Sequence, residues 1–370
     1  MKIKEFKLER LFARYSSKAR YRLSQSACEY CTMQEILDMA DEECKKMWDS
    51  LVLGYTDQTG FAPLREAVAK RFVTIRPSDI LELAPEEGIF IFMNTLLDPG
   101  DEVIVMQPCL PSLYEIPRAL GCKIIKWPLE ETSWGWNLDF NFLAENISPN
   151  TKLLVLNIPN NPTGFIPVKT EMDRILSLAD RMGTWVFCEE TYRGMEHDPA
   201  AALPSLSDMY PRATTIGGLP GTRIGWLVTK NKNILENCAA YKDYTTLCNN
   251  APGEILATIA MRNASDLLRR NHKIVLDNLN LAEKFFKKHK KLLHWIQPNG
   301  GSTAFPQLMK PFDVTEMCEK AMNEKELLII GERAFGVSTN NFRVGLGRLD
   351  FKDALDVFSD VIEDMEKKVS

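Results

Sequence analysis

Residues 152–164 read KLLVLNIPNNPTG. An apolar run, Lys152–Asn157, leads directly into Asn160-Asn161-Pro162-Thr163-Gly164, which has the composition of a turn. Short apolar runs bounded by Gly, Pro or Asn predict buried strands of a parallel sheet. Open α/β sheets bind ligands outside the carboxyl ends of their strands, so this turn is also a candidate ligand site. Turn chemistry by itself explains the same composition.

The same strand pattern recurs before and after this stretch, and helical patterns separate the runs. The other predicted strands are Glu102–Met106, Lys123–Lys126, Thr184–Cys188, Thr214–Gly217 and Ile224–Thr229. Helices are predicted over Gln34–Leu51, from Pro63 onward, and over Glu86–Leu97, Pro111–Leu120 and Glu171–Arg181. This alternation predicts an α/β fold with a mostly parallel sheet covered by helices on both faces.

The last hundred residues have a different organisation. A helical pattern from Gly253 to His289 is long enough for one or two helices, and the strands Glu326–Ile330 and Asn341–Gly345 and the helix Phe351–Lys367 follow. We therefore expect three regions: an N-terminal arm with part of a small domain (1–40), a large domain (41–265) and a smaller C-terminal domain (266–370).

Composition excludes several classes of protein. The 370 residues carry a formal charge of −5, and a nucleic-acid binder usually has a basic footprint instead. The apolar runs are far shorter than the ~18 residues of a membrane span. We therefore expect neither nucleic acid nor membrane as a partner.

Nine scattered cysteines do not form a disulfide framework, which favours a cytoplasmic location. Cys28 and Cys31 form a lone Cys-x-x-Cys without further ligands at similar spacing, so no metal is predicted. Eight basic residues between Lys2 and Arg22 are compatible with a mitochondrial presequence. We favour an amphipathic arm with Phe6, Leu8, Leu11 and Phe12 on one side.

Several polar segments carry candidate chemistry. Glu86-Glu87-Gly88 opens a helix, where free N–H groups and the helix dipole make either an anion site or an ordinary cap. Glu189-Glu190-Thr191-Tyr192 follows a strand end and brings a carboxylate and a phenol to the same edge as Asn161. Arg223 and Arg343 add two cations.

Taken in chain order, these segments resemble the class I/II aminotransferases, a family of pyridoxal-phosphate enzymes. The resemblance starts at Tyr21-Arg22-Leu23-Ser24, continues through Gly54-Tyr55 and Pro85-Glu86-Glu87-Gly88, and ends at Phe342-Arg343-Val344-Gly345. It is nearest to a branch that includes capreomycidine-synthase-like enzymes. It implies the type I fold of these enzymes, with a mostly parallel seven-stranded sheet in the large domain and a smaller α+β domain.

The resemblance also implies a cofactor, pyridoxal 5'-phosphate, and a role for each matching residue. The Glu86, Glu87 and Gly88 helix start and Arg223 would bind the phosphate, and Asn161 and Tyr192 the ring oxygen O3′. Glu189 would hold the proton on the pyridine nitrogen, and Leu110 would pack on the ring. Tyr55 would reach the phosphate of a partner subunit, which implies a homodimer. Arg343 would bind the α-carboxylate of a small amino-acid substrate.

Three departures from the family pattern bear on activity. Glu189 replaces an aspartate, and Leu110 replaces an aromatic residue. The third departure is larger, because the chain runs from Gly218 directly to Leu219 where the family carries the segment with its Schiff-base lysine. No catalytic residue can therefore be assigned. Gly218 to Gly221 could close a tight hairpin, so the deletion is compatible with folding.

Two interpretations of this gap remain open. In the first, the active protein carries further residues between Gly218 and Leu219 and is an ordinary aminotransferase. In the second, the deletion is real, and the protein is a pseudoenzyme that binds pyridoxal phosphate or an amino acid without transamination. A nicotinamide-binding enzyme is a distant third hypothesis, because no Gly-x-Gly-x-x-Gly follows a strand.

Overall fold

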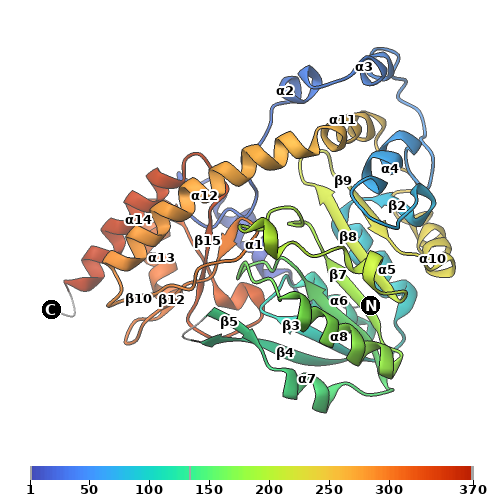
Figure 1. Ribbon diagram of the computed structural model, residues 1–370. Coiled ribbons are helices and arrows are strands. Elements are labelled where there is room, and N and C mark those ends of the chain that lie inside the picture. The colour runs from blue at the N-terminus through green and yellow to red at the C-terminus, as the bar shows by residue number, and fades with distance from the viewer. Residues whose placement is uncertain (1, 133–134, 368–370) are drawn as a thin grey trace.

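The computed structural model describes residues 2–132 and 135–367. Its largest element is a sheet of eight strands, counted within these residues, in the order β2-β9-β8-β7-β6-β3-β4-β5 (Figure 1). The strands are β2 (Ile80–Leu83), β3 (Glu102–Gln107), β4 (Lys123–Thr132), β5 (Gly135–Leu138), β6 (Thr151–Asn157), β7 (Trp185–Glu189), β8 (Ala213–Leu219) and β9 (Ile224–Val228). In this order, the five neighbouring strands β8, β7, β6, β3 and β4 pair in parallel. The strands β5, β9 and β2 each join through an antiparallel pairing.

The predicted α/β fold is confirmed, but the predicted number of seven strands is wrong. Compared with the six strands predicted by residue range, the structure adds β2 and β5, and β5 has no apolar run of its own. It pairs with the distal half of β4, which extends to Thr132 and is longer than predicted, in a register that places Leu138 opposite Leu129. Pairing with a neighbour therefore defines this strand, and periodicity within four residues could not reveal it.

Alternate residues of the parallel strands enter two separate cores. In β3, Val103 and Val105 pack under the helices α5 (Pro85–Leu96), α6 (Ser112–Leu120) and α10 (Lys232–Lys242). Ile104 and Met106 of the same strand pack on the opposite face, under α7 (Phe140–Asn146), α8 (Lys169–Met182) and α9 (Leu206–Met209). Burial on both faces explains why these strands are apolar throughout.

One predicted helix is divided in the structure, and a second pattern, for which one or two helices were predicted, forms two. The pattern over Gln34–Leu51 corresponds to α2 (Met33–Asp38) and α3 (Glu42–Asp49), because Asp41 caps the second helix and accepts a hydrogen bond from Cys44 N at 2.8 Å. The long pattern after Gly253 corresponds to α11 (Ala251–Arg262) and α12 (Ala264–Lys288), which meet at Asn263. The helix predicted from Pro63 is α4 (Ala62–Ala69).

The rest of the chain packs around a third core, to which α12 leads (Figure 1). Its helices are α13 (Val314–Lys325) and α14 (Phe351–Glu366) and its short strands are β1 (Tyr21–Arg22), β10 (Leu293–His294), β11 (Thr303–Ala304), β12 (Gln307–Leu308), β13 (Leu327–Leu328), β14 (Ile330–Gly331) and β15 (Phe342–Gly345). Three short 3₁₀ turns, η1 (Pro77–Asp79), η2 (Pro199–Ala201) and η3 (Glu332–Phe335), complete the elements in the described residues. The N-terminal β1 pairs in parallel with β13. The three predicted domain limits stay a prediction.

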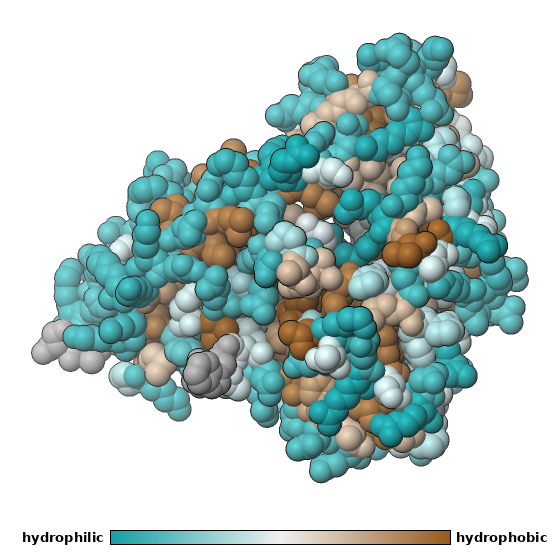
Figure 2. Space-filling model, in the orientation of Figure 1, coloured by the Kyte–Doolittle hydropathy of each residue, from teal (hydrophilic) through white to brown (hydrophobic). Residues whose placement is uncertain are grey.

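The predicted amphipathic arm forms helix α1 (Lys7–Tyr15). Leu8 is buried against Phe335 and Ala334, and Phe6, Leu11 and Phe12 are partly buried in the same cluster. On the face of the molecule in Figure 2, hydrophilic side chains cover the periphery and apolar ones gather towards the middle. Within the described ranges, none of the helices combines the length and apolar character that crossing a membrane requires.

Candidate functional site

The strands β6 and β7 end side by side and place Asn157 opposite Glu189 at the carboxyl edge of the sheet. Asn157 Nδ2 donates a hydrogen bond to Glu189 Oε2, and Thr191 N donates one to Glu189 Oε1 at 2.8 Å. Burial, together with a smaller contribution from the nearby Glu86 carboxyl, raises the pKa of Glu189 to about 7. Near neutral pH this side chain can therefore hold or release a proton.

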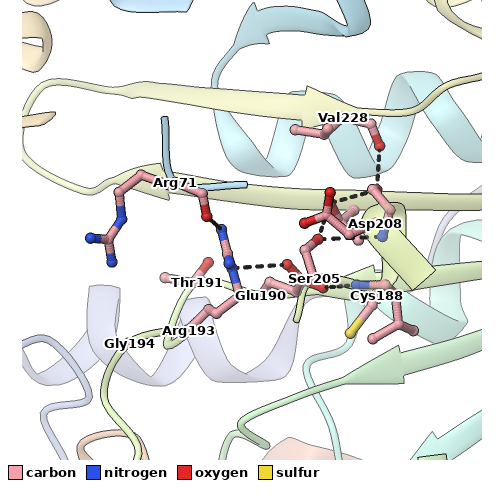
Figure 3. Close-up of polar contacts among 12 residues, drawn as sticks. Arg71, Cys188, Glu190, Thr191, Arg193, Gly194, Ser205, Asp208 and Val228 are labelled. Atoms are coloured by element: carbon pink, nitrogen blue, oxygen red, sulfur yellow. Dashed lines mark hydrogen bonds and ion pairs between the residues drawn. The ribbon is translucent and has the colours of Figure 1, made fainter. Parts of the chain in front are cut away.

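The adjacent Glu190 serves a different purpose, because successive side chains of a strand point to opposite sides. Its Oε2 lies 3.3 Å from Arg193 Nε, and its Oε1 accepts a hydrogen bond from Leu206 N at 2.9 Å. Arg193 in turn donates to Arg71 O at 3.0 Å. Figure 3 shows Glu190 between Arg193 and the loop at Ser205. Of the two consecutive glutamates, Glu189 faces the candidate site and Glu190 connects loops.

Arg343 lies on β15 and is 1% exposed. Its Nε donates to Ser24 O at 3.0 Å and its Nη1 to Asn161 Oδ1 at 3.1 Å, whereas Nη2 has no hydrogen-bond partner among the described residues. Burial lowers the pKa of Arg343 to about 10, still far above neutrality. The guanidinium is therefore a buried cation with an unused donor, as a site for a carboxylate requires.

Asn161 connects Arg343 to Glu189. Its backbone N donates to Asn157 Oδ1 at 2.7 Å, and Asn157 Nδ2 bonds Glu189. The predicted site residues Asn161, Glu189 and Arg343 are thus brought together in one buried hydrogen-bonded row, although they are up to 182 positions apart in the chain.

Tyr192 borders the same row, and its hydroxyl donates to Ser26 O at 2.9 Å. Burial raises its pKa to about 12, so the phenol stays protonated at neutral pH. Ser302 Oγ donates to the same carbonyl at 2.6 Å. The segment from Ser24 to Ser26 therefore crosses the site and bonds both Arg343 and Tyr192.

The start of α5 differs from the anion site that the sequence predicts. Pro85 occupies the first turn and has no N–H to donate. Glu87 Oε2 accepts a hydrogen bond from Ala84 N at 3.3 Å, so the chain's own carboxylate already caps this end. Gly88 packs against the sheet, because a Cβ there would lie 2.2 Å from Ile216 Cδ1. The geometry thus offers an incoming phosphate few free donors.

Glu86 adds a negative charge at this position. Solvent reaches its side chain, yet the surrounding protein raises its pKa by desolvation. Ser112 faces the Glu86 carboxyl and lowers this pKa, whereas Glu9 of α1 raises it and Arg223 lowers it. Charges of both signs, on Glu9 and on Arg223, therefore act on Glu86 at the α5 start.

The gap in the lysine segment is closed by a tight hairpin. The antiparallel pairing of β8 with β9 continues through Gly218 opposite Gly225 to Leu219 opposite Ile224. Four residues, Pro220 to Arg223, make the turn, so the expected hairpin forms, but it turns two positions later than the predicted Gly218 to Gly221. The three lysines next in the chain bond elsewhere: Lys230 Nζ donates to Asp208 O, Lys232 Nζ to Asp79 Oδ1 and Lys242 Nζ to Gln58 O.

Three further predicted site residues are not members of the hydrogen-bonded row of Arg343, Asn161, Asn157 and Glu189. Arg223 is exposed in the hairpin turn, and its Nη1 donates to Pro220 O at 3.3 Å. Leu110 is partly buried in the cluster of Phe335. Tyr55 is 89% exposed on the segment between α3 and α4 and makes no contribution to the row within this chain.

Sequence reasoning missed Asn157, Ser24 and Glu9. Asn157 is the last residue of a predicted strand, and a polar residue at that position was a signal that could have been used. Ser24 lies in the motif that begins at Tyr21, but its contribution is a backbone oxygen, which its residue type does not reveal. Glu9 acts through space and leaves no pattern in the sequence.

The sequence profile of the family described as "Aminotransferase class I and II" matches residues 22–352. The chain belongs to the class I and II aminotransferase family. Among its curated relatives, capreomycidine synthase of Streptomyces vinaceus is 27% identical over 308 residues, covering 80% of this chain and 77% of the relative. Aspartate aminotransferase of Thermotoga maritima is 23% identical, covering 88% and 86%.

Solved structures of aminotransferases have the same fold. A PLP-dependent (pyridoxal-phosphate-dependent) aminotransferase from Streptococcus suis superposes with a TM-score of 0.91 at 24% identity, covering 98% of this chain and 99% of that one. The PLP-dependent cyclase OrfR superposes with a TM-score of 0.90 at 24% identity, covering 99% and 98%. The resemblance to this family and its type I fold is therefore confirmed.

The cofactor of the family fits the residues present only in part. Glu189, Asn161 and Tyr192 offer polar groups at the carboxyl edge, but the α5 start carries Pro85 and Glu86 where a dianionic phosphate would need donors. Like charges at close range disfavour such a group. No group of three His, Cys, Asp or Glu side chains in the described ranges is placed to hold a metal ion.

Proposed function

We propose that this aminotransferase-family chain binds an α-amino acid at the carboxyl edge of its large sheet and does not transaminate it. The observation that carries the proposal is Arg343, a guanidinium 1% exposed whose Nη2 has no partner in the described part of the chain. A ligand carboxylate would supply the missing acceptor and the opposite charge. Glu189 and Tyr192 border the same space and would contact the rest of the ligand.

The hairpin between β8 and β9 supports the second half of the proposal. The family's lysine both holds the cofactor and moves a proton, and this chain has no residue in its place. Loss of a positioned general base typically lowers a rate about 10²–10⁴-fold. In this chain Gly218 and Leu219 stay in register with β9, so the strand pairing continues up to a four-residue turn.

A second candidate function is a pyridoxal-phosphate-dependent aminotransferase. Membership of the family favours it, together with Asn161, Tyr192 and Arg343 at the positions of the family motifs. It requires a form of the protein with additional residues, including a lysine, between Gly218 and Leu219.

One experiment separates the two candidates. Purified protein is incubated with pyridoxal phosphate, reduced with borohydride and mapped by mass spectrometry, alongside an intact mass for comparison with 42.1 kDa. We expect the intact mass to agree and no specific phosphopyridoxyl-lysine. A specific adduct in a peptide between Gly218 and Leu219 would establish the aminotransferase.

Ligand binding is tested separately by calorimetry with neutral amino acids such as L-norleucine. We expect saturable binding by the parent protein and none by Arg343→Met. Binding that survives this substitution would overturn the proposal.

We further propose a homodimer that functions in the cytoplasm. Val52, Leu53 and Tyr55 are 79%, 82% and 89% exposed, and Tyr244 on the neighbouring α10–α11 segment is 90% exposed. Thr56 Oγ1 bonds Asn249 O at 3.3 Å, which holds the two segments together. An apolar surface of this kind is typical of an interface. The nine free thiols are consistent with a reducing compartment.

A further inference from the structure

We propose that a cavity between the edge strand β5 and the strand β10 binds a neutral, planar nitrogen heterocycle of the size of a purine. The cavity has a volume of about 480 Å³, within the range of about 300–1,000 Å³ that is typical of small-ligand sites. None of the described residues that line it belongs to the row of Arg343, Asn161, Asn157 and Glu189. The inference therefore goes beyond the proposed function and does not depend on it.

Three aromatic side chains line this cavity. Trp136 lies on β5, Phe165 follows the turn after β6, and Trp295 follows β10. The Trp136 ring is tilted against Phe305, with 6.4 Å between the ring centroids. The Trp295 ring is stacked on Phe286 at 4.3 Å. Neither of these phenylalanines lines the cavity, so the contacts hold both indoles in place and leave aromatic surface on which a planar ligand ring can stack.

The two indoles also bring hydrogen-bond donors that lack acceptors. Trp136 Nε1 and Trp295 Nε1 are buried, and neither has a hydrogen-bond partner among the described residues. A buried N–H without an acceptor is unfavourable, and an indole nitrogen can only donate. Because both residues line the cavity, acceptor atoms of a ligand bound there would satisfy these donors. The ring nitrogens of a heterocycle are such acceptors.

His294 supplies an acceptor to the same cavity. Its Nε2 lies 3.2 Å from Glu131 Oε1, which places the proton of the neutral imidazole on Nε2 and leaves Nδ1 as an acceptor. The side-chain amides of Gln297 and Asn299 line the cavity as well and can donate or accept. A ligand ring that carries an amino group beside its ring nitrogens, as adenine does, matches this combination of donors and acceptors.

The charges around the cavity favour a neutral ligand. No lysine, arginine, aspartate or glutamate is among the described residues that line it, and the adjacent Glu131 is engaged by His294. A phosphate or a carboxylate would lose hydration in the cavity without gaining an ion pair. A neutral base or nucleoside loses far less, so it fits this cavity better than a nucleotide.

The test is isothermal titration calorimetry of the full chain at pH 8 with adenosine, AMP and D-glucose. Adenosine has ring acceptors and an exocyclic amine, AMP adds a phosphate, and D-glucose offers hydroxyl groups without an aromatic ring. We expect adenosine to bind saturably, AMP to bind at least about fivefold more weakly, and D-glucose not to bind.

Variants of the lining residues test the site itself. Trp136→Phe and Trp295→Phe each keep an aromatic ring and remove the N–H, so each should weaken adenosine binding about fivefold, the equivalent of one hydrogen bond. His294→Ala removes the acceptor at a side chain that is 44% exposed and should weaken binding by a similar factor. Trp48→Phe is the matched control, because Trp48 packs in another cluster and does not line the cavity. Circular dichroism verifies that each variant is folded.

The outcomes separate this inference from the proposed function. Absence of saturable adenosine binding would overturn it, as would tighter binding of AMP or D-glucose than of adenosine. Adenosine binding that is unchanged in all three cavity variants would overturn it too. Arg343→Met should leave adenosine binding unchanged, and its loss in that variant would show that adenosine occupies the Arg343 site instead. L-Norleucine binding tests Arg343 alone, so either proposal can fail without the other.

Discussion

Replacing Arg343 by methionine tests whether its charge is uncompensated in the folded protein. Methionine keeps an unbranched side chain in the cavity of β15 and removes the guanidinium. In most proteins a buried arginine is paired, and removal of one partner of such a pair costs about 3–5 kcal/mol. Arg343 instead has neutral acceptors, Ser24 O and Asn161 Oδ1, and an unpaired Nη2.

The expected change in stability follows from two opposing contributions. The pKa of Arg343 falls from 12.5 to about 10, and at about 1.4 kcal/mol per pKa unit its burial destabilises the folded state by about 3 kcal/mol at neutral pH. Methionine relieves this cost. It also loses two hydrogen bonds of about 1 kcal/mol each and contacts of the guanidinium with Phe335 and Phe12, worth about 1 kcal/mol. The contributions nearly cancel, so we expect a change within about 1 kcal/mol.

The assay is urea unfolding at pH 7 for parent and Arg343→Met, each with and without L-norleucine. A ligand at a hundred times its Kd stabilises the parent by about 2.7 kcal/mol, and the variant should gain nothing. Circular dichroism verifies that both proteins are folded.

A loss of 3–5 kcal/mol without ligand would refute this reasoning, since it would indicate a compensating negative charge that the hydrogen bonds do not reveal. Stabilisation of the variant by L-norleucine would equally refute it, because the carboxylate would then bind elsewhere.

Three further predictions concern the sheet edge, the surface and the hairpin. The pKa of Glu189 is raised in the folded state to about 7 from an ordinary 4.5, so the folded protein holds the extra proton and its free energy of unfolding falls as the pH rises through this window. Urea titrations at pH 5 and 8 should show that Glu189→Gln removes about 3 kcal/mol of this fall, and equal falls in both proteins would contradict it. Leu53→Glu should convert the proposed dimer to a monomer in sedimentation velocity, whereas an unchanged mass would exclude this surface as the interface. Gly218→Ala places a Cβ 2.5 Å from Pro85 Cγ and should lower the stability by about 1–3 kcal/mol, while Gly221→Ala, which meets nothing within 4 Å, is the matched control in thermal unfolding.

The sequence alone determined the frame of this protein. The apolar runs before Asn160 and Glu189 predicted β6 and β7, because a strand buried on both faces must be apolar throughout. Motifs at Asn161, Tyr192 and Arg343 indicated the family before any distance was known. The direct succession of Gly218 and Leu219, where the family carries its lysine segment, was also evident from the sequence, because it is a property of chain order.

Local patterns failed where a neighbour decided the outcome. The strand β5 exists because β4 extends far enough to pair with it, and the single helix expected over Gln34–Leu51 is divided because the Asp41 side chain caps a new one. Both are decided by partners that periodicity does not encode.

Only the tertiary structure decided the chemistry of the site. Identical residue types have opposite roles at positions 189 and 190, because one carboxyl bonds Asn157 at the edge of the sheet and the other pairs with Arg193. The tertiary structure also decides the role of Arg343, because no described residue offers its Nη2 a hydrogen-bond acceptor. Burial, hydrogen-bond partners and electrostatic neighbours come from segments far apart in the chain, and a sequence specifies them only once it has folded.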